Sequence, residues 1–186
     1  MRQIFDLFAS VILLLSLVIV ALFIAIAIRL TSKGPVLYWS ERIGKNNKIF
    51  KMPKFRSMLS GTPAVATHIL DNPDSYLSPI GSFLRSSSLD ELPQLFSVLK
   101  GDMSFVGPRP ALFNQVDLIA LRTEKGVDKL LPGITGWAQV NGRDDLSIPD
   151  KVALDAEYLN RQSFWFDMKI LWMTFLKVMK RDGVSH

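Results

Sequence analysis

Two adjacent carboxylates, Asp90 and Glu91, follow an arginine and three serines in the segment Leu84–Phe96. Ser88 and Glu91 have the spacing of a capping box, and Pro93 is tolerated in the first turn of a helix. We therefore expect a helix that begins near Asp90. Its free N–H groups would keep Asp90 ionised and favour a phosphate close by. The same residues also suit an ordinary helix start, because acidic side chains favour the helix dipole in any protein.

Three other stretches carry cations that could bind phosphate. Lys54 and Arg56 alternate with apolar residues, which would place them on one face of a strand or on a solvated edge strand. Arg109 stands between two prolines, and a rigidly held guanidinium suits bidentate phosphate binding, although an exposed turn has the same pattern. The glycine-rich stretch Pro132–Arg143 ends in Arg143, and its glycines would allow the backbone to approach a ligand closely.

The composition limits the chemistry of these residues. The chain of 186 residues contains no cysteine and only two histidines, His68 and His186. This excludes thiolate metal sites, disulfides and a cysteine nucleophile, so a metal would need carboxylates, which favour magnesium or manganese. The net charge of +5 suits phosphorylated substrates or anionic membrane lipid. We expect no nucleic-acid partner, since the basic residues are scattered and no nucleic-acid-binding motif is present.

An uncharged apolar run extends from Leu7 to Ile28. Its length as a helix is about 33 Å, which is enough to cross a bilayer and long for a signal peptide. Basic residues follow it, so the positive-inside rule places the remainder in the cytoplasm. We predict a membrane anchor over residues 1–30 and a cytosolic catalytic domain over residues 31–186.

The path of this anchor is open at the level of hydropathy. Ser10 and Ser16 could bond back to helix carbonyls and bend the helix, while Asp6 would be costly deep in lipid. The anchor could therefore span the bilayer or re-enter it.

The remaining pattern predicts a mainly α fold with a small β-hairpin and short strands, that is, an α+β domain. The last predicted helix is amphipathic and suits either the membrane interface or the domain core. The expected elements are a hairpin over Val36–Met52, and helices over Leu92–Lys100 with a stop at Gly101, over Leu112–Lys129, over Pro149–Asn160 and over Ser163–Arg181.

In their order along the chain, these segments resemble the bacterial sugar transferase family of polyprenyl-phosphate phosphoglycosyl transferases. The resemblance is closest to the small monotopic members that consist of the catalytic domain alone, and it extends from about Phe5 to Ser185. The matching segments are Ile4–Asp6, Thr31–Pro35, Glu41–Lys45, Lys54–Met58, Leu84–Gln94, Lys100–Pro110 and Pro132–Arg143.

The resemblance implies transfer of a phospho-sugar from a UDP-sugar to undecaprenyl phosphate or another polyprenyl phosphate, with release of UMP. It implies a location at the cytoplasmic face of the bacterial inner membrane, in glycoconjugate assembly. By this resemblance Asp90 is the nucleophile that forms a covalent phospho-sugar intermediate, and Glu91 helps to hold Mg²⁺, or Mn²⁺, on the diphosphate. The cations at motif positions, expected to bind substrate, are Lys54, Arg56, Arg85, Arg109 and Arg143.

The chain departs from the family pattern in its membrane helix. Family members commonly carry a Ser-Pro pair that breaks this helix and returns it to the same side of the bilayer. The corresponding position is near Val18 and Ile19, and no proline is present there. Re-entrance therefore depends on the resemblance together with Ser16 and Asp6.

Two other functions stay open. A metal-dependent glycosyltransferase could use Asp144 and Asp145 to bind a nucleotide sugar, and it would release UDP instead of UMP. A non-catalytic, membrane-anchored module could bind anionic lipid through its basic face. The sugar, the polyprenol length and the glycan pathway have no sequence signature, and a dimer is compatible with the sequence.

Overall fold

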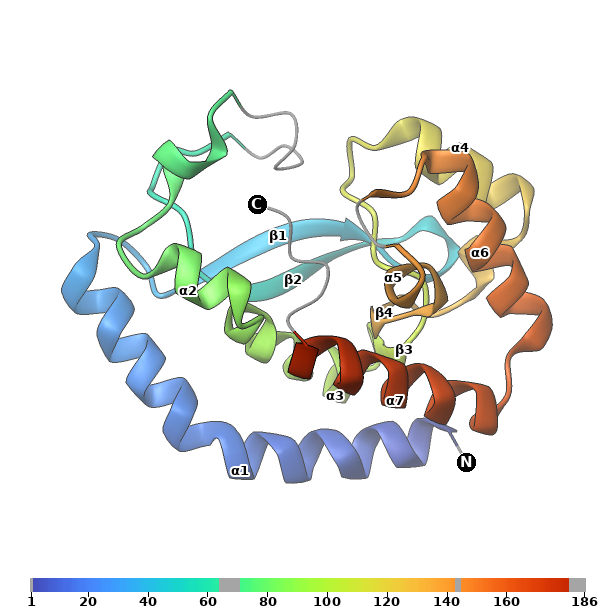
Figure 1. Ribbon diagram of the computed structural model, residues 1–186, viewed down its shortest axis with the longest axis horizontal. Helices are drawn as coiled ribbons and strands as arrows, with labels where there is room; N and C mark the ends of the chain where they lie inside the picture. Colours follow the sequence, from blue (N-terminus) through green and yellow to red (C-terminus); the bar gives the residue numbers. More distant parts are fainter. Residues whose placement is uncertain (1, 64–70, 143–144, 181–186) are drawn as a thin grey trace.

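The computed structural model describes residues 2–63, 71–142 and 145–180, and it confirms a mainly helical fold with short strands. The chain runs along a long bent helix, a hairpin, and then a series of short helices and two short strands (Figure 1). The elements are α1 (Arg2–Thr31), β1 (Leu37–Ile43), η1 (Lys45–Asn47), β2 (Ile49–Phe55), η3 (Pro73–Tyr76), α2 (Gly81–Ser86), η4 (Leu89–Gln94), α3 (Leu95–Lys100), β3 (Ser104–Val106), α4 (Val116–Glu124), η5 (Val127–Lys129), β4 (Gly133–Thr135), α5 (Trp137–Val140), α6 (Ile148–Arg161) and α7 (Phe164–Lys180).

The helix α1 follows one side of the molecule and is bent near its middle (Figure 1). No single helix of the described chain is both long and apolar enough to cross a membrane, whereas Ile4–Leu13 and Leu15–Thr31 meet these limits together, at an angle of 51°. The hydroxyl of Ser16 donates to the carbonyl of Leu13 across the bend, at 3.0 Å. Ser10 forms the same type of bond. The predicted back-bonding is confirmed, and such bonds are known to bend helices.

Both ends of α1 are tied to the rest of the protein. Near the first end, the buried carboxylate of Asp6 accepts a hydrogen bond from the hydroxyl of Ser104 in β3, at 2.7 Å. Beyond the other end, the guanidinium of Arg56 donates to the carbonyl and the hydroxyl of Ser32, at 2.9 and 2.7 Å. Gly34 follows with φ of 118°, and a Cβ there would lie 2.2 Å from Arg56. The turn after α1 therefore requires a glycine at this position.

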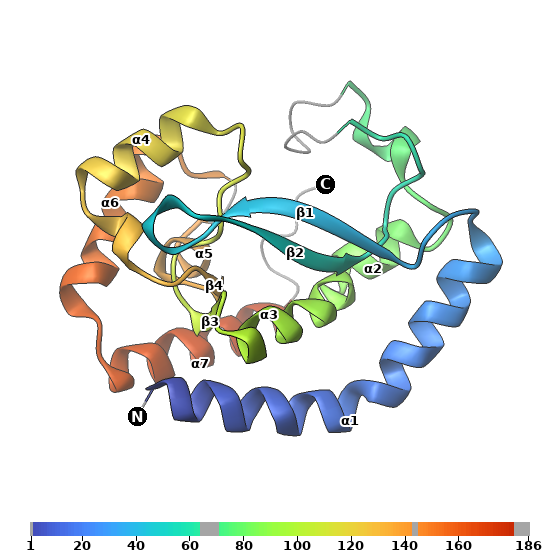
Figure 2. The same cartoon turned by 180° about the vertical axis from the view of Figure 1, so that it is seen from behind.

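The predicted hairpin is confirmed as the antiparallel pair β1–β2, in register from Leu37–Phe55 to Ile43–Ile49. It extends from the side of α2 towards α4 and α6 (Figure 2). Since β2 ends at Phe55, the prediction that Lys54 and Arg56 share one strand face is wrong. Lys54 bonds to η4, whereas Arg56 bonds to the turn after α1.

The glycine-rich stretch contains the strand β4 and the short helix α5, which the sequence did not predict. The strand β4 pairs with β3 in parallel. A Cβ on Gly133 would lie 2.1 Å from the backbone nitrogen of Gly107, and one on Gly136 would lie 2.1 Å from its carbonyl oxygen. Glycine is therefore needed at these two positions because two backbone segments meet there.

The main core joins β3 to α3, α6 and α7, and the second core joins the later part of α1 to β2 and α2. The predicted helices over Pro149–Asn160 and Ser163–Arg181 are confirmed as α6 and α7. The helix α4 is shorter than predicted, because a glycine turn separates it from η5. In the main core, Asp167 accepts a hydrogen bond from the hydroxyl of Tyr158 at 2.7 Å, which links α7 to α6.

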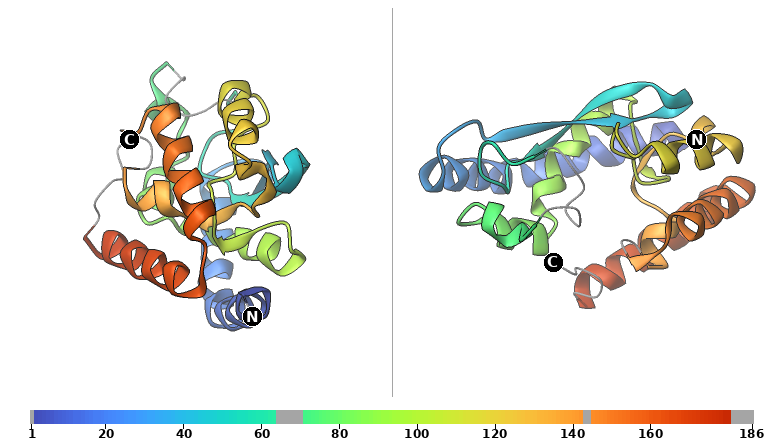
Figure 3. Two further views of the ribbon diagram at one scale, coloured as in Figure 1. Left: turned by 90° about the vertical axis from the view of Figure 1, so that its right-hand side faces the viewer. Right: turned by 90° about the horizontal axis from the view of Figure 1, so that it is seen from above.

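The helix α7 both packs against the core and exposes apolar side chains, so neither of its two predicted positions excludes the other. Phe5 of α1 meets Phe164 of α7 with ring centroids 5.9 Å apart, and the two helices then diverge (Figure 3). The buried side chains of α7 include Phe166 and Ile170. Its exposed apolar side chains are Phe164, Trp165, Trp172, Phe175, Leu176, Val178 and Met179.

Candidate active site

The two adjacent carboxylates lie in η4, a 3₁₀ helix that begins one residue before the predicted start. The predicted capping box is wrong, since Ser88 has a left-handed backbone with φ of 55° and its side chain makes no capping bond. This residue reverses the chain between α2 and η4, and its carbonyl accepts the N–H of Glu91 at 3.1 Å. The helix continues as α3 and stops at Gly101, with φ of 83°, as predicted.

Asp90 and Glu91 point in different directions because successive side chains of a 3₁₀ helix diverge by about 120°. Asp90 is buried, with 7% of its surface exposed, while Glu91 lines a cavity. Burial raises the pKa of Asp90, and the nearby Lys54 opposes this rise. The charge of Glu91 adds to the rise. The two carboxylates therefore occupy different environments, which suits different roles.

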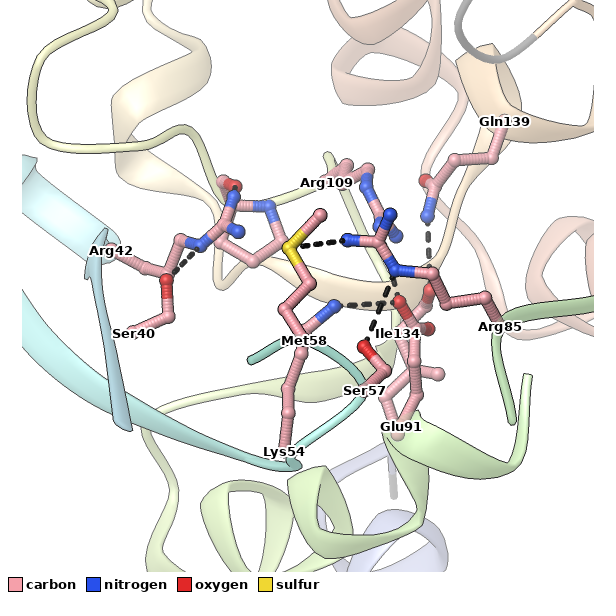
Figure 4. Close-up of polar contacts among 11 residues, drawn as sticks. Ser40, Arg42, Lys54, Ser57, Met58, Arg85, Glu91, Arg109, Ile134 and Gln139 are labelled. Carbon is pink, nitrogen blue, oxygen red and sulfur yellow. Dashed lines mark hydrogen bonds and ion pairs between the residues drawn. The ribbon is translucent and has the colours of Figure 1, made fainter. Parts of the chain in front are cut away.

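Three cations act on this pair of carboxylates, and Figure 4 shows the contacts with Glu91. The ammonium of Lys54 lies 2.9 Å from the Oε1 of Glu91, and the guanidinium of Arg109 donates to the same oxygen at 3.1 Å. Arg85 and Arg109 also act on Asp90, where their charges lower its pKa against the effect of burial. Three positive charges beside two negative ones leave an excess that suits a bound diphosphate.

One of the predicted substrate-binding residues, Arg56, is not part of this cluster. Arg56 is buried beside Ser32 and does not line the cavity; its Nε and Nη1 have no hydrogen-bond partner among the described residues. Arg143 lies outside the described residues, as does Asp144 of the alternative carboxylate pair. The neighbouring residues Gly142 and Asp145 both line the cavity.

The structure adds a support behind Arg109 that the sequence did not reveal. Arg122 of α4 pairs with Asp155 of α6 through two hydrogen bonds of 2.6 and 2.9 Å. The remaining Nη1 of Arg122 donates to the backbone carbonyl of Arg109 at 2.8 Å. Burial raises the pKa of Asp155, and Arg122 opposes this rise. No local pattern joins these residues, because the contact depends on how α4 and α6 pack.

A second arginine supports the next residue of the same loop. Arg42 of β1 donates to the carbonyl of Pro110 at 3.1 Å and to the hydroxyl of Ser40 at 3.0 Å. Burial lowers the pKa of Arg42 to about 10, and the charge of Arg109 acts in the same direction. Besides the two prolines, hydrogen bonds from Arg122 and Arg42 to the carbonyls of Arg109 and Pro110 therefore restrain this loop.

The cavity in front of Glu91 has a volume of about 440 Å³ and is lined by both polar and apolar side chains. Its size falls within the usual range for small-molecule sites. The polar side chains include Ser86, Ser87, Ser88, Glu91, Arg109 and Gln139, and the apolar side chains include Leu13, Leu17, Leu92, Leu95, Phe105 and Val178. A ligand that fits both kinds of side chain would carry a charged group and an apolar chain.

The described residues contain no group of three His, Cys, Asp or Glu side chains that could hold a metal. A magnesium ion is often held by one or two carboxylates together with substrate phosphates. Glu91 lines the cavity and fits that arrangement, provided that a diphosphate supplies the other oxygens.

Comparison with known proteins assigns the chain to a family. The sequence profile described as "Bacterial sugar transferase" matches residues 1–181. The chain therefore belongs to the bacterial sugar transferase family.

Three relatives illustrate the similarity. The "Undecaprenyl-phosphate glucose phosphotransferase" of Komagataeibacter xylinus is 42% identical, over 100% of this chain and 36% of the relative. The "Uncharacterized sugar transferase EpsL" of Bacillus subtilis is 40% identical, over 100% of this chain and 91% of the relative. The "UDP-glucose:undecaprenyl-phosphate glucose-1-phosphate transferase" of Escherichia coli is 43% identical, over 83% of this chain and 35% of the relative. The chain thus spans about a third of two of these relatives and nearly all of the other.

Proposed function

We propose that this chain transfers a phospho-sugar from a UDP-sugar to undecaprenyl phosphate and releases UMP, as the first membrane step in the assembly of a glycoconjugate. The observation that carries this proposal is the pair of unlike carboxylates beside three cations, of which Glu91 and Arg109 line a cavity that also has apolar side chains in its wall. The names of the K. xylinus and E. coli relatives support the same donor and acceptor chemistry.

The reaction proceeds in two displacements at one phosphorus. A carboxylate oxygen of Asp90 attacks the β-phosphorus of the UDP-sugar. The bond from this phosphorus to the bridging oxygen breaks, and UMP leaves with that oxygen and its electron pair. A phosphate oxygen of the lipid then attacks the same phosphorus and displaces Asp90, which returns to a carboxylate. The product is an undecaprenyl diphospho-sugar, and two easier steps replace one difficult step.

The three cations neutralise the charge that develops on the phosphoryl oxygens during both steps. Lys54 and Arg109 already contact Glu91, so they can move from this carboxylate to a bound diphosphate over a short distance. Glu91 would share a magnesium ion with the diphosphate, and the ion would add further neutralising charge. The proposed substrate contact of Arg143 is supported by the position of its neighbour Gly142 in the cavity wall.

The membrane part of the proposal is a re-entrant α1 with the catalytic body on the cytoplasmic face of the bacterial inner membrane. It is supported by the hydrogen bonds that join the two ends of α1 to the rest of the protein, at Asp6 and at Ser32. A helix that spans the bilayer would have to break one of them. Single cysteines introduced at Arg2 and Lys33 can be labelled in intact cells, because the chain has no cysteine of its own. Labelling at position 2 from the periplasm would exclude re-entrance.

The test of the reaction is incubation with undecaprenyl phosphate, magnesium and a panel of UDP-sugars. We expect release of UMP that depends on the lipid. Release of UDP would instead favour the glycosyltransferase alternative, and membrane binding without turnover of any donor would favour the non-catalytic module.

A further inference from the structure

We propose that the lipid acceptor enters the cavity between α1 and α7, and that Lys177 of α7 binds its phosphate. This inference rests on the proposed function, since it assigns a place to the acceptor of that reaction. No motif that we identified in the sequence includes Lys177. Its position in the cavity wall is the first observation that points to it.

The cavity connects the charged cluster with the two apolar helices. Leu13 and Leu17 of α1 line it on one side, and Val178 of α7 lines it on another. Glu91 and Arg109 belong to the same cavity. A phosphate at the charged end would therefore leave room for an attached apolar chain at the other end.

The apolar lining of the cavity continues onto the outer surface of the molecule. Leu15 and Val18 of α1 are exposed, as are Phe175 and Met179 of α7. The two helices diverge beyond their contact at Phe5 and Phe164, so the cavity lies between the diverging parts (Figure 3). A long polyprenyl chain could thus leave the cavity along surfaces that already suit lipid.

The charge on Lys177 fits the phosphate of such a ligand. Arg109 and Lys177 are the described cations in the cavity wall, and Arg109 already contacts Glu91. Lys177 is half-buried and forms an ion pair with none of the carboxylates in the described chain. A partly buried ammonium without a carboxylate partner favours an anionic ligand. A phosphate at Lys177 would approach the charged cluster from the side of the membrane helix.

The first experiment measures the steady-state constants of the Lys177→Met variant by UMP release. We expect the KM for undecaprenyl phosphate to rise at least about tenfold, the effect of losing one charge-assisted hydrogen bond. The KM for the UDP-sugar should change less than about twofold, and Lys177→Arg should recover most of the loss. Lys169→Met is the matched control. Lys169 belongs to the same helix as Lys177, but it lies over the ring of Trp137 and does not line the cavity.

The second experiment measures binding without turnover. Val178 lines the cavity and Met179 does not, and both side chains are exposed enough for labelling. We expect undecaprenyl phosphate in detergent micelles to slow maleimide labelling of Val178→Cys and to leave Met179→Cys unchanged. Undecaprenol and phosphatidylglycerol at the same concentration should protect neither position.

The two experiments separate failure of the subsite from failure of the proposed reaction. An unchanged lipid KM in Lys177→Met, or equal rises in both KM values, would overturn the role of Lys177 while the reaction stands. Equal protection by phosphatidylglycerol would show a general phospholipid site and would also overturn the inference. If the unmodified chain turns over no donor, the reaction fails, and the labelling experiment still decides whether the polyprenyl phosphate binds here.

Discussion

Two carboxylate and cation clusters stand on either side of Arg109, and they are built differently. In front of it, Glu91 faces the cavity and shares one oxygen between Lys54 and Arg109. Behind it, Asp155 is buried and binds Arg122 through two bonds. The front cluster has more positive than negative charge, while the rear pair is balanced. The front cluster is therefore arranged to receive an anion, whereas the rear pair is arranged to hold its shape.

The largest expected effect on activity is in the front cluster. Asp90→Asn removes the proposed nucleophile, so transfer should fall by at least about a thousandfold. Folding stability should stay the same or rise, because burial disfavours the charge that is removed. UMP release and thermal unfolding measure the two quantities. Full activity in this variant would refute the assignment.

A control separates this effect from a general loss of negative charge. Asp102 pairs with the exposed Lys100 away from the cavity, so Asp102→Asn should keep its activity. Mass mapping after incubation with UDP-sugar alone should place the phospho-sugar on Asp90. A phospho-sugar on Glu91, which lines the cavity, would reverse the two roles.

The largest expected effect on stability is in the rear pair. Arg122→Met leaves Asp155 buried without its partner, so the free energy of unfolding should fall by about 3–5 kcal/mol. The double variant Arg122→Met, Asp155→Leu should recover most of this loss, because apolar residues can replace a buried ion pair. Denaturant unfolding gives both values.

The double variant also tests the contact between the clusters. It still lacks the hydrogen bond from Arg122 to the carbonyl of Arg109, so we expect its activity to stay reduced when its stability has recovered. Recovery of both would mean that the rear pair serves stability alone.

A smaller effect is expected in the pH dependence of the front cluster. Lys54 lowers the pKa of Asp90, so Lys54→Met should raise that pKa further above its ordinary value. Because the nucleophile must be ionised, the acidic limb of kcat/KM for UMP release should move to higher pH. Lys51→Met, on the exposed part of the same strand, should leave the limb in place. A limb that moves to lower pH would contradict the predicted electrostatics.

The smallest expected effect is at a surface pair. Lys100 lies 3.1 Å from Asp102, and its side chain is 77% exposed. Lys100→Ala should change the free energy of unfolding by less than about 1 kcal/mol, because solvent screens such pairs. A change as large as that of Arg122→Met would mean that burial does not separate the two kinds of ion pair.

The sequence predicted the features that depend on local chemistry. The hairpin, the stop at Gly101, and the helices α6 and α7 follow from turn residues, capping glycine and apolar periodicity, and all were confirmed. The capping box failed because Ser88 adopts a left-handed backbone to join two helices. That conformation depends on where α2 packs, which no local pattern contains.

Contacts between distant segments were also out of reach of the sequence. Lys54 and Arg56 stand two residues apart, yet the strand ends between them. Lys54 therefore contacts Glu91 of η4, whereas Arg56 contacts Ser32 after α1. Arg122 and Asp155 meet only because α4 packs beside α6. Motif positions therefore located the carboxylates and three of their cations. They did not distinguish a cation in the cavity from one that holds the end of a helix.

The glycine contacts between β3 and β4 have a consequence for how mutations would be tolerated. Gly107 meets Gly133 and Gly136 backbone to backbone, with no side chain between them. The spacing at this point is set by the main chain itself, so a side chain added at any of these three glycines would force the two segments apart. Arg109 follows two residues later. Arg109 lines the cavity, so this contact between main chains fixes where its side chain starts.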